Sequence, residues 1–233
     1  MSTRHTAAAL LLLLAACSGP RYFTSPDFAQ KTANHKLVAI LPVQMIMTGK
    51  KPEKLTDEDI AKIEEGESRA FQMSLYNNIL KNHTTKKGTI MVELQPYEKT
   101  MQIFKEKGID LRKSWEADPM DLCKVLGVDA VVKTRVQKTR YMSDLASYGI
   151  DLGYHILSQI SIPATVIISG VVGPAKTNDI DAQCSLFNGA DGSLLWKDMY
   201  KASASWNAPA NDVIEGMTHT FAYHFPYRKK APK

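Results

Sequence analysis

Blocks of apolar and polar positions divide residues 37–227 into predicted strands and helices. The run Leu37–Val43 is apolar throughout, which is typical of a strand covered on both faces. Pro42 marks its end, because proline has no N–H to donate to a neighbouring strand. In residues 129–138, side chains on a mainly apolar face alternate with side chains on a more polar face, as in a strand with one face in the core. The other predicted strands are residues 89–94, 179–187 and 194–201.

Helices are predicted where apolar residues recur every three or four positions. Thr56 and Asp59 form a capping-box pattern at the start of a long helix that runs to about Asn82. The further predicted helices are residues 97–107, ended by Gly108; residues 119–126, between Asp118 and Gly127; and a final helix capped by Asp212 and Glu215.

The last two predicted strands are joined by a turn sequence. Residues 188–193 contain Asn-Gly and Asp-Gly, the dipeptides best suited to a positive φ, so the sequence predicts a β-hairpin. Trp196 on its return strand is expected to pack on a helix. Together the elements predict an α/β (α+β) fold over residues 37–227. This is a single domain with a mixed β-sheet, packed helices, and a C-terminal β-hairpin plus helix.

Residues 143–173 form an apolar insertion whose role the sequence leaves open. Helical spacing continues to Ile160, and residues 162–172 are almost wholly apolar. The segment is too short for a membrane helix and lacks the alternation of a barrel strand. A buried helix-plus-strand or second helical turn is favoured, and an oligomer interface or a lipid contact are the alternatives. For these alternatives the expected contact residues are Leu152, Ile156, Val166 and Ile168.

Residues 1–16 have the pattern of a secretory signal peptide. Arg4 and His5 supply a basic start, and residues 7–16 are apolar, about half of the ~20 residues that a membrane-spanning helix needs. The leader runs into Leu14-Ala15-Ala16-Cys17, which resembles the lipobox of bacterial lipoproteins. This resemblance implies cleavage before Cys17 and acylation of both its thiol and the new amino terminus. The alternative is an ordinary secretory leader followed by an incidental cysteine.

The residues after the cysteine suggest where the chain is anchored. Ser18, in place of Asp, resembles the Gram-negative sorting pattern for the outer membrane. Residues 17–36 are polar and rich in turn-forming residues, which predicts a lipidated tether. We therefore expect a protein that is lipid-anchored to the outer membrane and faces the periplasm.

Charge adds one feature, a basic tail over residues 228–233. The chain has 29 Lys and Arg and 24 Asp and Glu, and the leader holds one basic and no acidic residue, so the mature chain has 28 against 24, a net charge of +4. Four of the basic residues lie in the tail, which is expected to be solvated, with contact to anionic lipid or glycan as the alternative. No predicted element interleaves basic and aromatic residues, so a nucleic-acid partner is not expected.

Few residues indicate a catalytic or metal-binding role. His219 and His224 are five positions apart, which places them on different faces of a helix. The sequence has no Gly-x-Ser-x-Gly elbow, phosphate-binding loop or His-Glu-x-x-His motif, so we expect no catalytic residue, metal or cofactor. Cys123 and Cys184 each lie on the apolar face of a predicted element, which favours free, buried thiols. A disulfide between them is the alternative, because the periplasm is oxidising.

Two tryptophans are the candidate contact residues. Trp115 and Trp206 fall in predicted loops, where an exposed indole is well suited to bind a partner protein. This hypothesis depends on position alone, and burial of both indoles among apolar side chains would contradict it.

Four segments carry a resemblance to a known family. They are Leu37–Val43, Leu126–Val132, Ser185–Trp196 and Phe225–Arg228. In these patches the chain resembles a lipoprotein group related to the curli-secretion lipoproteins and to the penicillin-binding-protein activator lipoproteins. The resemblance implies a layered α/β domain in the periplasm, on an outer-membrane anchor and without an active site.

Two functional classes follow. The favoured one is a non-catalytic interaction or regulatory module that binds an envelope protein. The alternative is a ring-forming homo-oligomeric subunit of an outer-membrane secretion or assembly complex, in which residues 143–173 contact neighbouring subunits or lipid. A hydrolase is a third class, which a deep pocket with converging His, Asp and Ser side chains would support.

Overall fold

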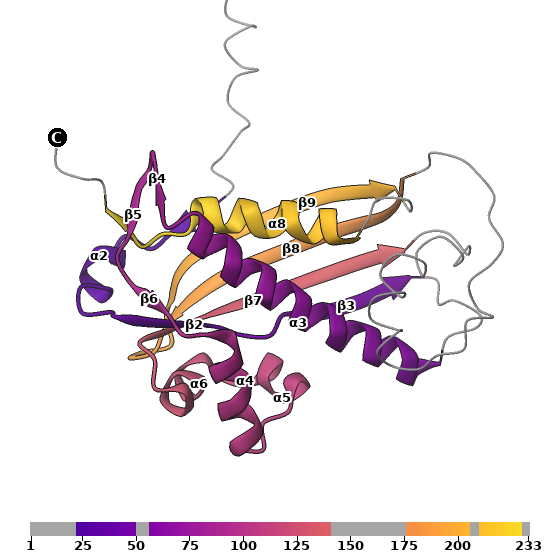
Figure 1. Ribbon diagram of the computed structural model, residues 1–233, viewed down its shortest axis with the longest axis horizontal. Coiled ribbons are helices and arrows are strands. Elements are labelled where there is room, and N and C mark those ends of the chain that lie inside the picture. Colours follow the sequence, from indigo (N-terminus) through magenta and orange to yellow (C-terminus); the bar gives the residue numbers. More distant parts are fainter. Residues whose placement is uncertain (1–21, 50–55, 141–175, 206–209, 230–233) are drawn as a thin grey trace, which may run out of the picture.

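A seven-stranded mixed sheet lies at the centre of the computed structural model, which describes residues 22–49, 56–140, 176–205 and 210–229 (Figure 1). The long strand β7 (Ala130–Arg140) pairs in parallel with β2 (Leu37–Ile40) and β3 (Gln44–Gly49), and antiparallel with β8 (Lys176–Asn188). The order is β1-β9-β8-β7-β2-β6, where β1 is Tyr22–Thr24, β6 is Glu93–Leu94 and β9 is Leu194–Ser205. The predicted mixed sheet and the β8–β9 hairpin are confirmed.

The remaining described elements are helices and a small second sheet. The helices are α2 (Phe28–Lys31), α3 (Asp57–Lys81), α4 (Tyr97–Glu106), α5 (Leu111–Glu116), α6 (Pro119–Leu126) and α8 (Ala210–His224). The second sheet is antiparallel and has the order β10-β5-β4, from Arg228–Lys229, Gly88–Ile90 and Thr84–Thr85.

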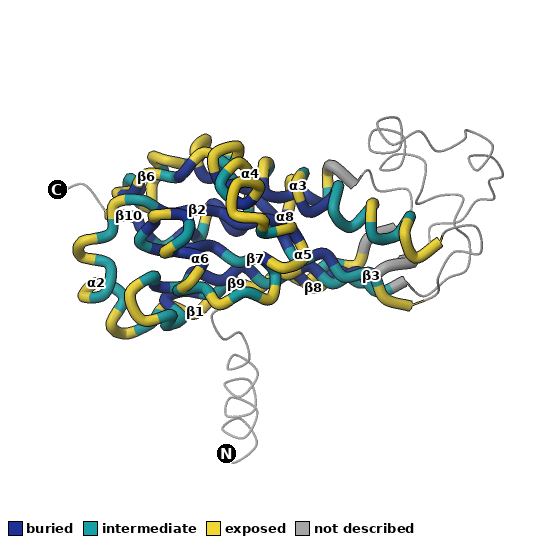
Figure 2. Tube along the Cα trace, turned by 90° about the horizontal axis from the view of Figure 1, so that it is seen from below, coloured by how far each residue is buried: buried dark blue, intermediate teal, exposed yellow. Residues whose placement is uncertain are grey.

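Helices cover both faces of the large sheet, so the core has two parts. On one face α3 and α8 pack together over β7, β8 and β9, and the rings of Phe71 and Phe221 lie 6.5 Å apart. On the other face α4 and α6 bury Phe104 and Leu122 against Val131 of β7. Figure 2 shows that the buried residues lie along the strands of the sheet, between these two helical layers. Trp196 is fully buried in the same core cluster as Met217 and Phe221 of α8, and it packs edge-on to Phe225, which directly follows that helix.

Local capping explains where the predicted helices begin and end. The Thr56 hydroxyl accepts a hydrogen bond from the Asp59 N–H at 3.1 Å, and the Asp59 carboxylate accepts one from the Thr56 N–H at 2.9 Å. This confirms the capping box at the start of α3. Gly127 ends α6 with a φ of 66°, in the left-handed region that glycine tolerates best.

Pro42 interrupts a strand that then continues. Both β2 and β3 pair with β7, but Ile40 lies opposite Val132 whereas Gln44 lies opposite Arg135. Three residues, 41–43, therefore face two on β7, which is the arrangement of a β-bulge. The sequence predicted the end of the strand at Pro42 but not its continuation as β3.

The predicted tether is shorter than expected. Residues 22–36, assigned to it from composition, include β1 and α2 and are docked on the domain. The Ser25 N–H donates to the Leu195 carbonyl at 2.8 Å, and the Phe28 ring lies 5.4 Å from that of Tyr227. The prediction of a free tether was wrong for this part of the chain, because its contacts come from residues far away in sequence.

Four further boundaries differ from prediction. The expected strand 89–94 is two short strands, β5 and β6, which belong to different sheets. Residues 111–116, expected to be loop, form α5, and α8 begins at Ala210, before the predicted cap Asp212. Arg228 and Lys229, assigned to the solvated tail, form β10. The guanidinium of Arg228 donates to main-chain carbonyls of three residues, which explains its order.

Candidate functional site

Trp115 is the one predicted site residue that lies within the described part of the chain. The predicted lipidation site Cys17, the second indole Trp206 and the apolar contact residues Leu152, Ile156, Val166 and Ile168 lie outside the described residues. Their roles stay predictions.

Trp115 is held by a short helix and not by the predicted loop. Asp110 caps α5, since its Oδ1 accepts the Lys113 N–H at 2.7 Å, and the same bond lowers the pKa of Asp110. Leu111 and Ser114 are buried and fix the helix on the domain. Trp115 is left half-buried, and among the described residues its Nε1–H, itself shielded from solvent, has no hydrogen-bond acceptor. An indole N–H in this state can bind a partner's acceptor if a small movement exposes it.

Arg112 fixes the position of Trp115 relative to α3. Its Nη2 lies 2.8 Å from Glu64 Oε2, and its Nε lies 3.3 Å from Glu65 Oε1. The hydrogen bond to Glu64 is the main reason that the pKa of Arg112 is raised. The same guanidinium lies 5.1 Å from the centre of the Trp115 ring, within the range of a cation–π contact.

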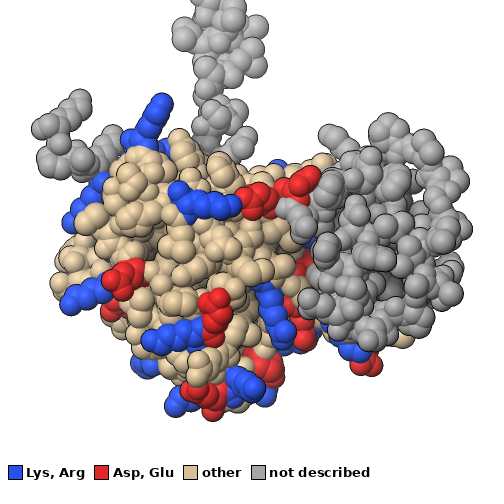
Figure 3. Space-filling view, in the orientation of Figure 1, with Lys and Arg blue, Asp and Glu red and all other residues tan. Residues whose placement is uncertain are grey.

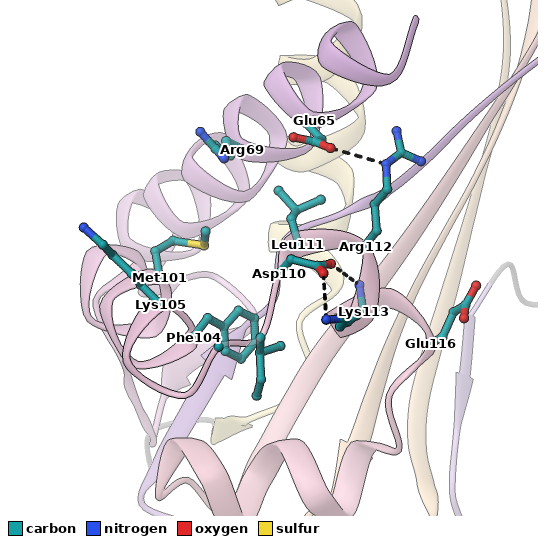
Figure 4. Close-up of a pocket in the computed structure, with 12 residues that line it drawn as sticks. Glu65, Arg69, Met101, Phe104, Lys105, Asp110, Leu111, Arg112, Lys113 and Glu116 are labelled. Atoms are coloured by element: carbon teal, nitrogen blue, oxygen red, sulfur yellow. Dashed lines mark hydrogen bonds and ion pairs between the residues drawn. The ribbon is translucent and has the colours of Figure 1, made fainter. Parts of the chain in front are cut away.

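A hollow of about 970 Å³ lies between α3, α4 and α5. Figure 4 shows Arg69 and Lys105 on one side of it and the side chains of α5 on the other. We call it the α3–α5 pocket. Its apolar lining residues are Met101, Phe104, Ile109 and Leu111, and its charged ones are Glu65, Arg69, Lys105, Asp110, Arg112, Lys113 and Glu116. The apolar floor and mixed charged rim resemble the centre and edge of a protein interface.

A second hollow of about 450 Å³ lies on the other side of α5, against the sheet. Trp115 lines it together with Pro42, Arg135 and Gln183. Lys133 also lines it and donates from Nζ to the Ala117 carbonyl at 2.7 Å, while burial lowers its pKa. We call this the sheet-side pocket, and α5 with its two pockets the α5 surface. Trp115 is thus a partly exposed aromatic side chain in the sheet-side pocket, on a helix whose residues line both hollows.

His224 and Asp198 form the one His–carboxylate hydrogen bond among the described residues. His224 Nδ1 lies 2.8 Å from Asp198 Oδ2, and Asp198 is fully buried. The imidazole packs between Tyr22 and Tyr223, with ring centres 5.2 Å and 5.5 Å away. Within the described chain no hydroxyl or thiol is hydrogen-bonded to this histidine, so the pair lacks the nucleophile of a hydrolytic triad.

The two described thiols are buried and free, as favoured from the sequence. Burial raises the pKa of both Cys123 and Cys184 to about 12. Because the thiolate is the reactive form, neither side chain is an activated nucleophile at neutral pH.

Two further kinds of feature are absent from the described residues. These residues contain no group of three or more His, Cys, Asp or Glu side chains placed to hold a metal ion. None of the helices in the described ranges is long and apolar enough to cross a membrane.

No protein-family model matches this sequence, and no curated protein sequence matches it. Solved structures similar to the chain include a PelC dodecamer from Paraburkholderia phytofirmans, with 11% identity, a TM-score of 0.44, and coverage of 90% of this chain and 97% of that one. The lipoprotein GNA1162 from Neisseria meningitidis is 12% identical, with a TM-score of 0.39 and coverage of 81% and 98%. The C-terminal domain of LpoB from Salmonella enterica is 9% identical, with a TM-score of 0.38 and coverage of 77% and 94%. At these values the alignments decide neither family nor function, and the lipoprotein resemblance of the sequence stays a prediction.

Proposed function

We propose that this chain is a non-catalytic lipoprotein, anchored through Cys17 to the outer membrane and facing the periplasm, that binds an envelope protein through its α5 surface. The anchor is inferred from the lipobox-like Leu14-Ala15-Ala16-Cys17. The binding role depends on one observation, which is that half-buried Trp115 lines the sheet-side pocket with an indole N–H that has no acceptor among the described residues.

The α5 surface has the composition of a binding hot spot. Tryptophan and arginine are the residues most enriched among those that dominate binding energy, and here Arg112 lies on the Trp115 ring. Because α3 and the cap of α5 already fix both side chains, a partner would lose little free energy in ordering them. The charged rim includes Arg69, Lys105 and Glu116, none of which forms an ion pair with another described residue, so they are available to a partner.

We do not propose a catalytic role for the α5 surface. Its groups are Arg, Lys and carboxylate side chains, which are mostly paired with each other or with main-chain groups. A general base next to a hydroxyl or thiol is the minimum for covalent catalysis, and the residues lining the two pockets do not provide that pair.

Site-specific cross-linking in cells tests the proposal. A photoreactive residue placed at exposed Glu116 should form one discrete adduct in the envelope, whereas the same residue at exposed Leu80, on the distant end of α3, should not. The cross-linked protein, once identified, should bind the purified acylated chain, and Trp115→Ala should weaken this binding by about tenfold or more. Trp115→Phe, which keeps an aromatic ring, should weaken it less. Equal cross-linking at both positions, or unchanged affinity of Trp115→Ala with an intact fold, would contradict the proposal.

A further inference from the structure

Three segments without an acidic residue meet on one side of the domain. They are residues 22–26, 81–92 and 223–229. The second and third are joined where β10 pairs with β5 and where Arg228 Nη1 donates to the His83 carbonyl at 3.3 Å. The first reaches the third where the Tyr22 ring lies 5.2 Å from the His224 ring.

This side combines exposed aromatic rings with unpaired cations. Tyr22 is 46% exposed and Tyr223 is 39% exposed, and Lys87 Nζ lies 3.8 Å above the Tyr223 ring. Within the described ranges, Lys86, Lys87 and Lys229 form no ion pair. Basic side chains project from the upper left of the molecule in Figure 3 without acidic ones beside them. We call the side formed by these five residues the basic aromatic face.

We propose that the basic aromatic face lies against the anionic phospholipid headgroups of the membrane in which Cys17 is anchored, an inference that rests on the proposed lipid attachment. Tyr22 is five positions after Cys17. At ~3.3–3.6 Å per residue, Tyr22 lies at most about 18 Å from the acylated cysteine. The face that carries β1 is therefore the part of the described domain held nearest the bilayer.

The chemistry of the face fits headgroups better than the bilayer interior. Tyrosine rings are amphipathic and are enriched at the level of the headgroups. Lysine side chains lay their methylene groups along apolar surface while the ammonium reaches phosphate, and clustered lysines are attracted to anionic lipid. The two tyrosines and three lysines of the face supply both contacts.

On the opposite side of the domain, acidic residues lie among the basic ones. Lys113 pairs with Asp110 and Lys124 with Asp121, each at 3.3 Å, and Lys105, which forms no ion pair with another described residue, is followed by Glu106. Figure 1 places α4, α5 and α6 below the sheet and β4 and α8 above it. With the basic aromatic face on the lipid, the α5 surface points into the periplasm, where a partner can reach it.

Site-specific quenching on the full-length acylated chain tests the orientation. A fluorophore is attached to Thr84→Cys, in the β4–β5 hairpin, or to Gln102→Cys, on α4, both exposed positions. The chain is placed in vesicles of phosphatidylglycerol and phosphatidylethanolamine that carry a headgroup-linked quencher. We expect quenching at position 84 to exceed that at position 102 by about fivefold or more, and this difference to shrink in phosphatidylcholine.

Lys→Gln variants test whether the basic aromatic face binds anionic lipid or only lies near it. Removing two cations with Lys86→Gln and Lys229→Gln should lower the ratio of docked to undocked molecules about 25-fold, at roughly fivefold per lysine. The matched pair Lys99→Gln and Lys107→Gln, exposed on and just after α4, should leave it unchanged. Equal quenching at positions 84 and 102, or an equal effect of both charge pairs, would overturn the orientation while the anchor stands. Failure of the native chain to partition into vesicles at all would overturn the anchor as well.

Discussion

Lys31 Nζ lies 2.8 Å from Asp191 Oδ2, although the two residues are 160 positions apart in the chain. The contact joins α2, in the segment that follows the predicted lipid anchor, to the turn of the β8–β9 hairpin. The same ammonium also donates to Ser193 Oγ at 2.8 Å. The segment that follows the predicted anchor is therefore fixed to the domain from Tyr22 onward, which in the proposed lipoprotein would limit how far the domain can move from the membrane.

Acidification should weaken this contact. The pKa of Asp191 is held well below its usual range, first by the hydrogen bond from Lys31 and then by those from Ser193. A carboxylate with a lowered pKa in the folded state stabilises the fold above its ordinary pKa of about 3.9, and loses that contribution as the pH falls toward the folded-state pKa. The free energy of unfolding should thus fall between pH 5 and pH 3, and Asp191→Asn should flatten this fall. Denaturant titrations at several pH values measure it, and an unchanged slope in the variant would show that Asp191 is not responsible.

Gly189 should not tolerate a side chain. A Cβ built there would lie 2.7 Å from the Asp129 carbonyl oxygen and 2.8 Å from Cys123 Cβ, both in well-packed surroundings. Gly189→Ala should lower the free energy of unfolding by about 1–3 kcal/mol. Gly216→Ala on α8 is the control, because its Cβ would meet only the Tyr200 hydroxyl at 3.6 Å and alanine favours a helix. Thermal unfolding of both variants compares them; a neutral Gly189→Ala would mean that the hairpin does not pack on α6 in this way.

Lys138 and Glu67 form a buried ion pair between β7 and α3, with side chains 7% and 0% exposed. Lys138→Met leaves the Glu67 carboxylate in the core without this cation, and should cost about 3–5 kcal/mol of stability. The double variant Lys138→Met/Glu67→Leu removes both charges and should recover most of the loss. Chemical denaturation of the two variants and the parent distinguishes these cases. Additive losses in the double variant would show that the pair is not coupled.

The two buried thiols should be protected from alkylation. With both pKa values raised to about 12, Cys123 and Cys184 are almost wholly protonated at pH 8. Iodoacetamide should modify them more than about a hundredfold more slowly in the native protein than in denaturant. In denaturant the acylated chain should show two reactive thiols, whereas a third would mean that Cys17 is unmodified. Fast labelling of the native chain would contradict their burial.

The fold was predictable where local patterns determine it. The capping box at Thr56 and the glycine at position 127 set the ends of α3 and α6 where the sequence placed them. The hairpin followed from its turn dipeptides. By contrast, β3 was missed because Pro42 looks like an end, and only the pairing with β7 shows that it lies in a bulge. The docking of residues 22–36 was missed for the same kind of reason, since Asp191 and Leu195 are distant in sequence.

The candidate site was predictable only in part. Trp115 could be selected as an unusual indole outside the predicted elements, but its helix has six residues, too few for periodicity to reveal. Asp110, three residues before Lys113, was the one local signal for that helix. The two pockets depend on how α3, α4 and the sheet come together around α5, and no sequence pattern gives that arrangement.

Mass spectrometry of the chain purified from its native membranes tests the central claim most directly, because both the anchor and the orientation of the α5 surface depend on Cys17. The predicted result is a mature protein whose first residue is Cys17, with acyl groups on its thiol and amino terminus. An unmodified Cys17, or a chain that still carries residues 1–16, would contradict the account.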